Sequence, residues 1–402
     1  MKELSTRKKL LFTLLLLAVF AALAEGAARI YLHQFKGYTG GKLLQYEFDP
    51  YKNITPTPSY VDSRGLAHNA QGFRRSSDVA RAKPPGTYRI FLMGGSTAYG
   101  LGGVWPHIQE KYEVLENSET IDAYLERQLT ARFPGTRFEV INAAIPSIWT
   151  HHHLIYLNQT ILKYSPDMVI LLDGYNDFYF YGRDHDQFLS YAYQEHSRTI
   201  MGDPTLGSLV YVNFWWLGRK SAFAHVALRQ ARVVKQLFQR PSNRRPIQVD
   251  SAIAGLQDVY PRNALKMVER IAMLLQQERV HAVFALQPML IMERGRPGMP
   301  EIERKMFEFN RESYLPNYEE FMLRSVPIVR DLERTTVERF GATFIDATPI
   351  FKNAKGQVFT DYAHLTPSAN EMLSNHIVDQ VLETIRLDLA THQPVTLASP
   401  DQ

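Results

Sequence analysis

Three side chains at two distant points of the sequence could together perform nucleophilic catalysis. Ser96 follows Gly94 and Gly95 directly after an apolar run, and Asp361 precedes His364 by three residues. A serine hydroxyl is a weak nucleophile that needs a general base, and the base needs a group that orients it. In a turn, Asp361 can accept a hydrogen bond from the His364 ring, which leaves the second ring nitrogen to face Ser96. The sequence therefore predicts a Ser-His-Asp triad.

A nucleophile of this kind also needs donors for the oxyanion that forms when it attacks a carbonyl. Such donors are backbone amides at strand ends and side-chain amides. Asn176 follows the apolar run 168–172 in "MVILLDGYND". We expect its side-chain amide to be one of these donors.

The elements that must position these groups can be predicted from the apolar pattern. Continuous apolar runs predict strands at 88–93, 138–141, 168–172, 281–286 and 342–346, and amphipathic stretches between them predict helices. Thr366 and Pro367 are typical of a helix start, with Thr as the N-cap and Pro at the first position. Apolar strands alternating with helices favour an α/β fold whose parallel sheet is covered on both faces. Ligands of such sheets bind at the carboxyl ends of the strands, where Ser96 and Asn176 are expected.

Together these residues resemble the signature blocks of the SGNH/GDSL hydrolase family, the GDSL-like lipases and acylhydrolases. The blocks occur in order over about 88–385, as Gly94-Gly95-Ser96, Gly174-Tyr175-Asn176-Asp177 and Asp361-Tyr362-Ala363-His364. The segment Asn69–Arg74 is similar to a lead-in of membrane-anchored bacterial members. The resemblance implies a flavodoxin-like doubly wound sheet, with Ser96 as nucleophile, His364 as base and Asp361 as the group that orients the base. It also implies the Ser96 amide and Asn176 as oxyanion donors.

One block departs from the family pattern. The second block usually reads Asn-Ala-x-x-x-Gly, and the amide of its glycine completes the oxyanion hole; this chain places Ser147 there, in "NAAIPS". A backbone amide survives that exchange, whereas backbone torsions that only glycine reaches would not. The resemblance thus implies that the backbone amide of Ser147 is a third oxyanion donor, provided that serine adopts the backbone torsions of the glycine that it replaces.

A second departure is an insertion at about 178–250, which we expect to be helical. It begins with the aromatic residues 178–181, and between Pro204 and Gln248 it has no Asp or Glu. Its basic residues are Arg219, Lys220, Arg229, Arg232, Lys235, Arg240, Arg244 and Arg245, interleaved with Trp215, Trp216 and Phe223. Such a stretch could lie on an anionic membrane surface or hold an acidic polymer. Alternatively, it is an ordinary solvated helix that packs its apolar face on the core.

The N-terminus carries a membrane signal. Lys2, Arg7, Lys8 and Lys9 precede the apolar run 10–24, a pattern that predicts a cytoplasmic start and an exported remainder. Ala22-Leu23-Ala24 fits a cleavage site, which would release a secreted or periplasmic protein. Alternatively, the helix continues through residues 26–28 and spans the bilayer with some tilt. We favour this single-pass anchor in the inner membrane, with the catalytic domain on the periplasmic side.

The amino-acid composition excludes several classes of protein and of functional site. The 402 residues are 45% hydrophobic, which excludes a disordered chain, and the lack of cysteine excludes a thiolate nucleophile and cysteine-based zinc sites. Adjacent residues of a helix point in different directions, so His151, His152 and His153 do not predict a metal site. We expect no cofactor, metal or nucleic-acid partner.

The chain divides into an anchor or signal peptide (1–32), an irregular lead-in (33–87), a hydrolase domain (88–388) and a flexible tail (389–402).

The function expected from these residues is that of a serine esterase or acylhydrolase. The resemblance suggests an O-acylated glycan or a lipid ester outside the cytoplasm as the substrate. If a sugar hydroxyl instead of water resolves the acyl-enzyme, the protein is an O-acyltransferase. A non-catalytic glycan-binding or assembly protein that keeps the fold is the third possibility.

Overall fold

The five predicted apolar runs form one parallel sheet. Its strands are β3 (Thr87–Gly94), β4 (Arg137–Asn142), β5 (Met168–Asp173), β6 (His281–Leu286) and β7 (Thr343–Asp346). They lie in the order β4-β3-β5-β6-β7, and every neighbouring pair is parallel. Numbered along the chain this is 2-1-3-4-5, the flavodoxin-like order. The predicted α/β fold is therefore confirmed.

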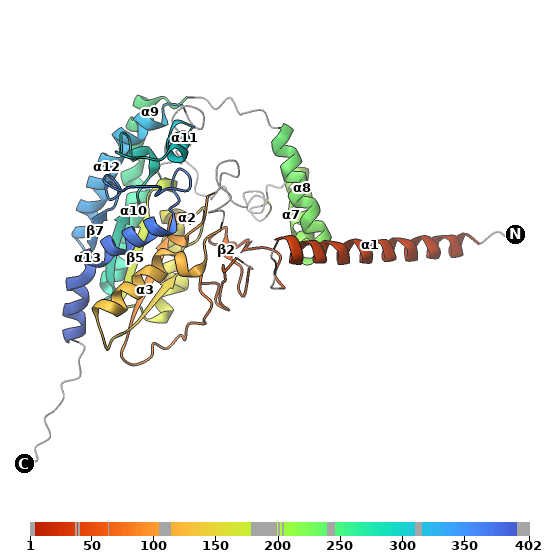
Figure 1. Ribbon diagram of the computed structural model, residues 1–402, viewed down its shortest axis with the longest axis horizontal. Helices are drawn as coiled ribbons and strands as arrows, with labels where there is room; N and C mark the ends of the chain where they lie inside the picture. The colour runs from red at the N-terminus through yellow and green to blue at the C-terminus, as the bar shows by residue number, and fades with distance from the viewer. Residues whose placement is uncertain are drawn as a thin grey trace, which may run out of the picture. The chain divides into compact units, whose positions relative to one another are not determined.

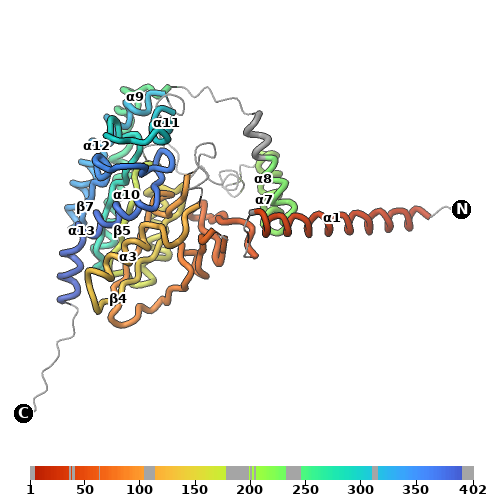
Figure 2. Tube along the Cα trace, in the orientation of Figure 1, coloured from red at the N-terminus to blue at the C-terminus, as the bar shows by residue number. Residues whose placement is uncertain are grey.

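The computed structural model shown in Figures 1 and 2 describes most of the chain. The described residues are 5–36, 38, 41–62, 64–103, 114–177, 199, 202, 205–238, 246–309 and 316–391. The aromatic residues 178–181 that open the predicted insertion lie outside them. So does most of the predicted tail, from 392 onward.

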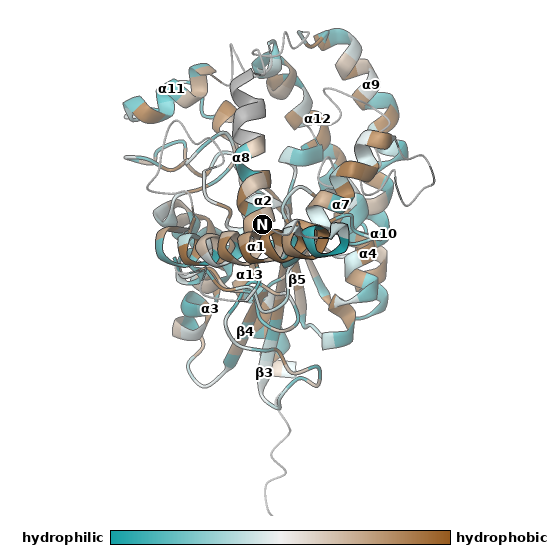
Figure 3. Ribbon diagram, turned by 90° about the vertical axis from the view of Figure 1, so that its right-hand side faces the viewer, coloured by the Kyte–Doolittle hydropathy of each residue, from teal (hydrophilic) through white to brown (hydrophobic). Residues whose placement is uncertain are grey.

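Helices cover both faces of the sheet. In Figure 3 the strands lie between α3 (Ile121–Arg132) on one side and α4 (Thr150–Gln159) and α10 (Ala264–Gln277) on the other. The helix α3 packs against α13 (Pro367–Thr391), while α10 packs against α4, α9 (Val249–Arg262) and α12 (Tyr318–Glu338). Because both faces are covered, every residue of β3 and β5 is buried, which explains why these strands are apolar without alternation.

The helix boundaries confirm some expectations and correct others. Thr366 Oγ1 accepts a hydrogen bond from the Ala369 amide at 3.3 Å, so Thr366 is the predicted N-cap of α13. The helix then continues to Thr391, so residues 389–391 are helical and do not belong to a flexible tail. The sequence pattern also predicts a helix over about 151–164; in the structure α4 ends at Gln159, and a 3₁₀ turn (Ile161–Tyr164) follows it. The remaining short helices are α2 (Ser96–Tyr99), α11 (Glu301–Phe309) and the 3₁₀ turns Asn117–Glu119 and Leu290–Met292.

Contacts group the chain into two units. One unit comprises Ala80–Asp186 and Pro246–Gln402 and holds the sheet; the other comprises Met1–Val79 and Gln187–Arg245. The second unit contains α1 (Thr6–Lys36), a two-stranded antiparallel ribbon of β1 (Tyr46–Glu47) and β2 (Thr55–Pro56), α7 (Leu206–Lys220) and α8 (Ala222–Phe238). We call these the sheet unit and the anchor unit.

The N-terminal helix of the anchor unit is long and apolar enough to cross a membrane. The qualifying stretch is Thr6–Phe35, whose most apolar window is not buried in the protein. The α1 ribbon is mostly brown in Figure 3. The expected N-terminal apolar helix is therefore present and is continuous through Ala24, and its length and composition are those of a signal sequence or of a single membrane span.

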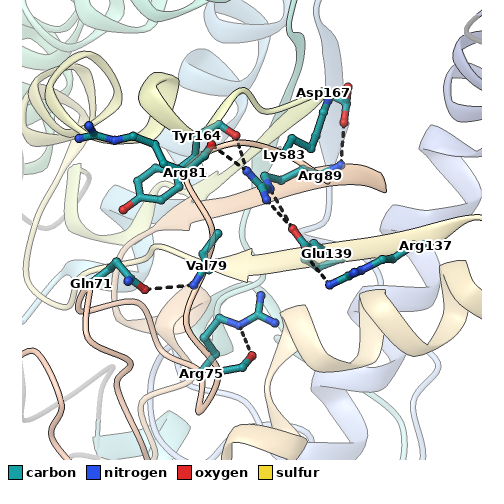
Figure 4. Close-up of polar contacts among 12 residues, drawn as sticks. Gln71, Arg75, Val79, Arg81, Lys83, Arg89, Arg137, Glu139, Tyr164 and Asp167 are labelled. Atoms are coloured by element: carbon teal, nitrogen blue, oxygen red, sulfur yellow. Dashed lines mark hydrogen bonds and ion pairs between the residues drawn. The ribbon is translucent and has the colours of Figure 1, made fainter. Parts of the chain in front are cut away.

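A hydrogen-bonded turn organises the lead-in segment of the anchor unit. Asn69 Oδ1 accepts the amides of Gln71 at 3.0 Å and Phe73 at 2.9 Å. Gly72 has φ +85°, and Gln71 Oε1 accepts the Val79 amide at 3.1 Å (Figure 4). The glycine of the Asn69–Arg74 segment thus serves a tight turn.

At the amino ends of the strands, buried charges are paired with opposite charges. Arg89 in β3 is fully buried, and its guanidinium bonds Glu139 of β4 at 2.7 and 2.9 Å and the Tyr164 carbonyl at 2.6 Å (Figure 4). Asp167, which precedes β5, forms an ion pair with Lys83 and accepts the Arg89 amide at 2.7 Å. These contacts join the starts of three strands.

Candidate active site

Two glycines bring Ser96 to the carboxyl end of β3. Gly94 has φ +149°, and a Cβ there would lie 2.0 Å from the Leu172 carbonyl oxygen of β5. A Cβ on Gly95 would lie 2.9 Å from Asn176 Nδ2. Neither position accommodates a side chain without displacing its neighbours. Ser96 therefore begins α2 on a turn without bulk, where the first amides of a helix lack intrahelical acceptors.

The structure brings Ser96, His364 and Asp361 into one hydrogen-bonded chain. His364 Nε2 lies 2.7 Å from Ser96 Oγ, and His364 Nδ1 lies 2.7 Å from Asp361 Oδ2. The side chains of His364 and Asp361 are only 2% and 1% exposed. With Asp361 accepting from Nδ1–H, the lone pair of Nε2 is directed at the serine hydroxyl, which is the tautomer that a general base requires.

The turn that carries Asp361 and His364 is held by its own hydrogen bonds. Asp361 Oδ1 accepts the amides of Ala363 at 2.9 Å and His364 at 3.0 Å, while Oδ2 holds the imidazole. The Thr360 amide donates to the His364 carbonyl at 2.8 Å. One carboxylate thus fixes both the backbone turn and the ring, which explains why a spacing of three residues suffices.

Further hydrogen bonds join this turn to the ends of β3 and β6. Thr97, next to the serine, donates to the Ala363 carbonyl at 3.1 Å and accepts from Gln287 Nε2 at 3.0 Å. The Leu290 amide donates to the Tyr362 carbonyl at 3.0 Å. The relative positions of Ser96 and His364 are therefore set by polar contacts from the ends of these two strands.

The predicted oxyanion donor Asn176 lies directly against the backbone before the serine. One hydrogen of its amide is used by the Ile148 carbonyl, at 2.7 Å from Nδ2. That bond fixes the plane of the buried amide, and in the part of the chain that the structure describes its second hydrogen has no acceptor. Ile148 follows Ser147, so the loops that carry the predicted side-chain and backbone donors are in direct contact.

Ser147 adopts the backbone conformation that the glycine of the family pattern would favour. Its φ is +65°, in the left-handed region, where an L-residue costs about 1–2 kcal/mol relative to glycine. The exchange of glycine for serine therefore keeps the turn at a modest cost. Asn142, at the start of the same block, is fully buried and donates to Asp122 at 2.7 Å and to the Ala98 carbonyl at 3.1 Å.

Three carboxyl groups interact behind the Asn176 loop. Asp173 and Asp177 flank that loop and are buried, and Glu333 comes from α12. Burial, then the negative charges of Asp173 and Glu333, raises the pKa of Asp177 well above its usual range. Burial also raises the pKa of Glu333 to about 7, despite a hydrogen bond from the Tyr260 hydroxyl. In the part of the chain that the structure describes, none of the three forms an ion pair with lysine or arginine.

The network extends into α4. Thr150 Oγ1 lies 3.1 Å from both carboxylate oxygens of Asp177, and His153 Nε2 lies 2.5 Å from Asp173 Oδ2. His153 therefore bonds a carboxylate and does not join His151 and His152 around one point. Among the described residues, no group of three or more His, Asp or Glu side chains is arranged to hold a metal ion.

The sequence pointed to Ser96, His364, Asp361 and Asn176 as candidate site residues but gave no role to Asp173, Asp177 or Thr150. A usable signal was present for Asp173, because a carboxylate directly after the apolar run "MVILL" must sit at the buried end of a strand. Glu333 carried no such signal, since it lies in a charged helix whose position depends on tertiary packing.

No family model and no curated protein matches the sequence. Solved structures that match include an α/β hydrolase from the metagenome of Lake Arreo, Spain, at 13% identity and TM-score 0.38, covering 73% of this chain and 94% of that one. An acetylxylan esterase from Geobacillus stearothermophilus matches at 11% identity and TM-score 0.37. A protein from Parabacteroides merdae that is described as a GDSL-like lipase matches at the same identity and TM-score. Both matches cover 73% of this chain and 94% of the other. Similarity at this level assigns neither an activity nor a substrate to this chain.

Proposed function

We propose that this protein is a serine ester hydrolase in which Ser96 is the nucleophile, His364 the general base and Asp361 the residue that orients the base. The observation that carries the proposal is the continuous chain of two 2.7 Å contacts from Ser96 Oγ through the His364 ring to Asp361. An oriented imidazole on a serine at the end of a parallel strand matches the roles that define such triads.

The proposed reaction proceeds through an acyl-enzyme. Ser96 Oγ attacks the ester carbonyl carbon as His364 Nε2 takes the hydroxyl proton, and Asp361 stabilises the resulting imidazolium. Asn176 Nδ2 and the amides of Ser96 and Ser147 donate to the oxyanion. The C–O bond to the alcohol then breaks, and the alcohol leaves with the proton from Nε2. Water, deprotonated by His364, releases the acid and restores the serine.

The substrate class that we propose is an O-acylated glycan or a lipid ester outside the cytoplasm. Two observations support it: the resemblance of the signature blocks to exported acylhydrolases, and the basic residues before the apolar part of α1. In the proposed topology α1 is retained as a single-pass anchor of the inner membrane, and the sheet unit is periplasmic. Retention is supported by the unbroken helix across Ala24, whose continuation packs against α8.

A fluorophosphonate probe tests the catalytic proposal directly, because it reacts with activated serines irrespective of the acyl group. We expect the probe to label the purified chain, Ser96→Ala to abolish labelling, and Ser118→Ala, an exposed serine, to leave it intact. Failure of the wild-type chain to react would favour the non-catalytic alternative.

A panel of short and long p-nitrophenyl esters, with and without a sugar acceptor, then defines the reaction. Release of free acid in water supports the hydrolase. Acyl transfer to the sugar, with little release in its absence, would identify an O-acyltransferase working from the same serine.

Extraction with high salt tests the anchor: the chain should stay with membranes, whereas a soluble mature chain beginning at Glu25 would show cleavage.

A further inference from the structure

The helix α7 exposes an unusually apolar surface. Its outer face carries large apolar side chains that are each 40–80% exposed, namely Leu206, Leu209, Val210, Phe214, Trp216 and Leu217. At 100° per residue these positions fall on one half of the helix. Ser208, Trp215 and Gly218 fall on the opposite half and are buried in the anchor unit. We call the exposed half the outer face of α7.

Polar groups on the outer face are few, and one is satisfied within the helix. Asn213 lies on this face, and its Nδ2 donates to the Leu209 carbonyl at 2.8 Å. Lys220 lies on the same side at the last residue of the helix, from which a long side chain can reach lipid phosphates. A helix on the surface of a soluble domain normally exposes its polar side. In α7, the exposed half instead carries the large apolar side chains, whereas the protein-facing half includes Ser208.

The turn between α7 and α8 is attached to the N-terminal helix at the end of its apolar run. Glu25 Oε2 accepts hydrogen bonds from Ser221 Oγ at 2.7 Å and the Phe223 amide at 3.1 Å, and Oε1 accepts the Ala222 amide at 3.0 Å. Ala28 and Leu32 of α1 form a small core with Ala222. Because Glu25 directly follows the run 10–24, these contacts hold the α7–α8 turn close to the level where α1 leaves the bilayer.

The length and charge of the helix favour one occupant for the outer face. At 15 residues, α7 spans about 22 Å, shorter than the roughly 30 Å hydrocarbon core, so it cannot cross the membrane. Between Pro204 and Gln248 the sequence has no acidic residue, and the exposed Lys220 ends the helix, which suits anionic headgroups; Arg219 is ion-paired with Glu47.

We propose that α7 is an interfacial membrane helix whose outer face is buried in the headgroup–acyl boundary of the bilayer that α1 anchors. The partner is therefore a lipid surface, and the anchor unit contacts it through two helices. This inference goes beyond ester hydrolysis and rests on the proposal that α1 is retained as an anchor. It adds a second point of membrane contact to the anchor, which limits how far the anchor unit can tilt relative to the plane of the membrane.

The absence of cysteine makes a site-specific test straightforward. Single cysteines replace Val210, Phe214 or Leu217 on the outer face, with Leu387→Cys as the matched control on an exposed apolar position of α13. Each full-length variant is labelled with an environment-sensitive fluorophore and reconstituted into vesicles of phosphatidylethanolamine and phosphatidylglycerol. Reaction with the fluorophosphonate probe confirms that each variant is folded.

We expect blue-shifted emission and quenching by nitroxide lipids from the three α7 labels, and neither from the Leu387 label. A nitroxide near the headgroup should quench more than one at the chain terminus, because interfacial helices lie about 5–10 Å deep. If the α7 labels behave like the control, the inference is wrong and the anchor stands. Labels that are shielded from water without lipid quenching would indicate a protein partner and also overturn it. A chain that does not associate with vesicles would refute the anchor and the inference together.

Discussion

The two ends of the parallel sheet treat buried charge in opposite ways. At the amino ends, the buried Arg89 is neutralised by Glu139, and Asp167 is neutralised by Lys83. At the carboxyl ends, burial and neighbouring negative charge raise the pKa values of Asp177 and Glu333, and neither carboxyl group forms an ion pair with lysine or arginine among the described residues. The sheet unit therefore has one end at which buried charge is paired with lysine or arginine and another at which, among the described residues, it is not.

This difference indicates that the buried charged groups at the amino ends serve stability, whereas those at the carboxyl ends serve function. Ions that hold strands together gain from complete pairing, because an unpaired buried charge costs several kcal/mol. Strongly perturbed carboxyl groups instead cluster where a protein performs chemistry. On this comparison, substitutions at the carboxyl end should change activity more than stability, and substitutions at the amino end should do the reverse.

The largest expected effect is the loss of activity in Ser96→Ala. Without the nucleophile, kcat on a p-nitrophenyl ester should fall by at least about a thousandfold, as it does when a triad member is removed. The free energy of unfolding should change little, since the hydroxyl contributes a single half-buried contact. Steady-state kinetics and a urea titration measure the two quantities on the same preparation. Unchanged turnover would refute the assignment of Ser96.

The next effect concerns the proposed oxyanion donors, which are of two kinds, a side-chain amide and backbone amides. Asn176→Ala removes a side-chain donor and should lower kcat by about a hundredfold to a thousandfold, or about 3–4 kcal/mol. Ser147→Ala and Ser147→Gly keep the backbone amide, and each should cost less than about fivefold, under 1 kcal/mol. If Ser147→Ala proves as damaging as Asn176→Ala, the serine hydroxyl acts directly. A harmless Asn176→Ala would exclude that residue from the oxyanion hole.

At the amino end, Arg89→Met should destabilise the protein without altering the catalytic step. The substitution leaves Glu139 with only the exposed Arg137 and removes the bond to the Tyr164 carbonyl. We expect a loss of about 3 kcal/mol in the free energy of unfolding, the lower end of the range for a broken buried pair. The kcat per folded molecule should be unchanged.

Arg137→Met is the matched control, because it removes the exposed arginine from the same glutamate. An exposed ion pair contributes about 0–1 kcal/mol, so the urea midpoint should barely move. Equal losses in the two variants would mean that burial does not distinguish the two arginines.

The features that were predicted correctly from the sequence are those that depend on residues close together in the chain. All five strands follow from continuous apolar runs, and the Asp361–His364 turn follows from a spacing of three residues that one carboxylate can close. The N-cap at Thr366 is local in the same sense. In each case the physical cause acts over a few residues and is therefore visible in the sequence.

The features that it missed depend on packing between distant segments. Glu333 comes near Asp173 and Asp177 only through the packing of α12 against α9, α10 and β7, and Arg89 meets Glu139 only through the register of two strands. The positive φ of Ser147 could not be predicted, because serine, unlike glycine, gives no indication of a left-handed backbone. Helix ends were misplaced where 3₁₀ turns or long continuations follow the last apolar position.

The smallest predicted effect is a pH dependence of stability that originates in the uncompensated carboxylates. Because the pKa of Glu333 rises from 4.5 to about 7 on folding, the folded chain retains a proton that the unfolded chain releases between these values. The associated stability is complete below pH 4.5 and is lost as the pH rises through 7. For this half-buried group the loss should be on the order of 2 kcal/mol. Asp177, whose pKa is also raised, should add to it in the same direction.

Glu333→Gln keeps the shape and can still accept the Tyr260 hydroxyl, but it has no charge to bury. Urea midpoints measured across the acidic-to-neutral range should fall less steeply with pH in this variant than in the wild type. The variant should consequently be the more stable of the two above about pH 7, where the wild-type carboxylate is ionised. Glu338→Gln, at an exposed position of the same helix, should reproduce the wild-type slope. A Glu333→Gln variant with the wild-type slope would show that this carboxyl group is compensated after all, and the contrast between the two ends of the sheet would then rest on Asp173 and Asp177 alone.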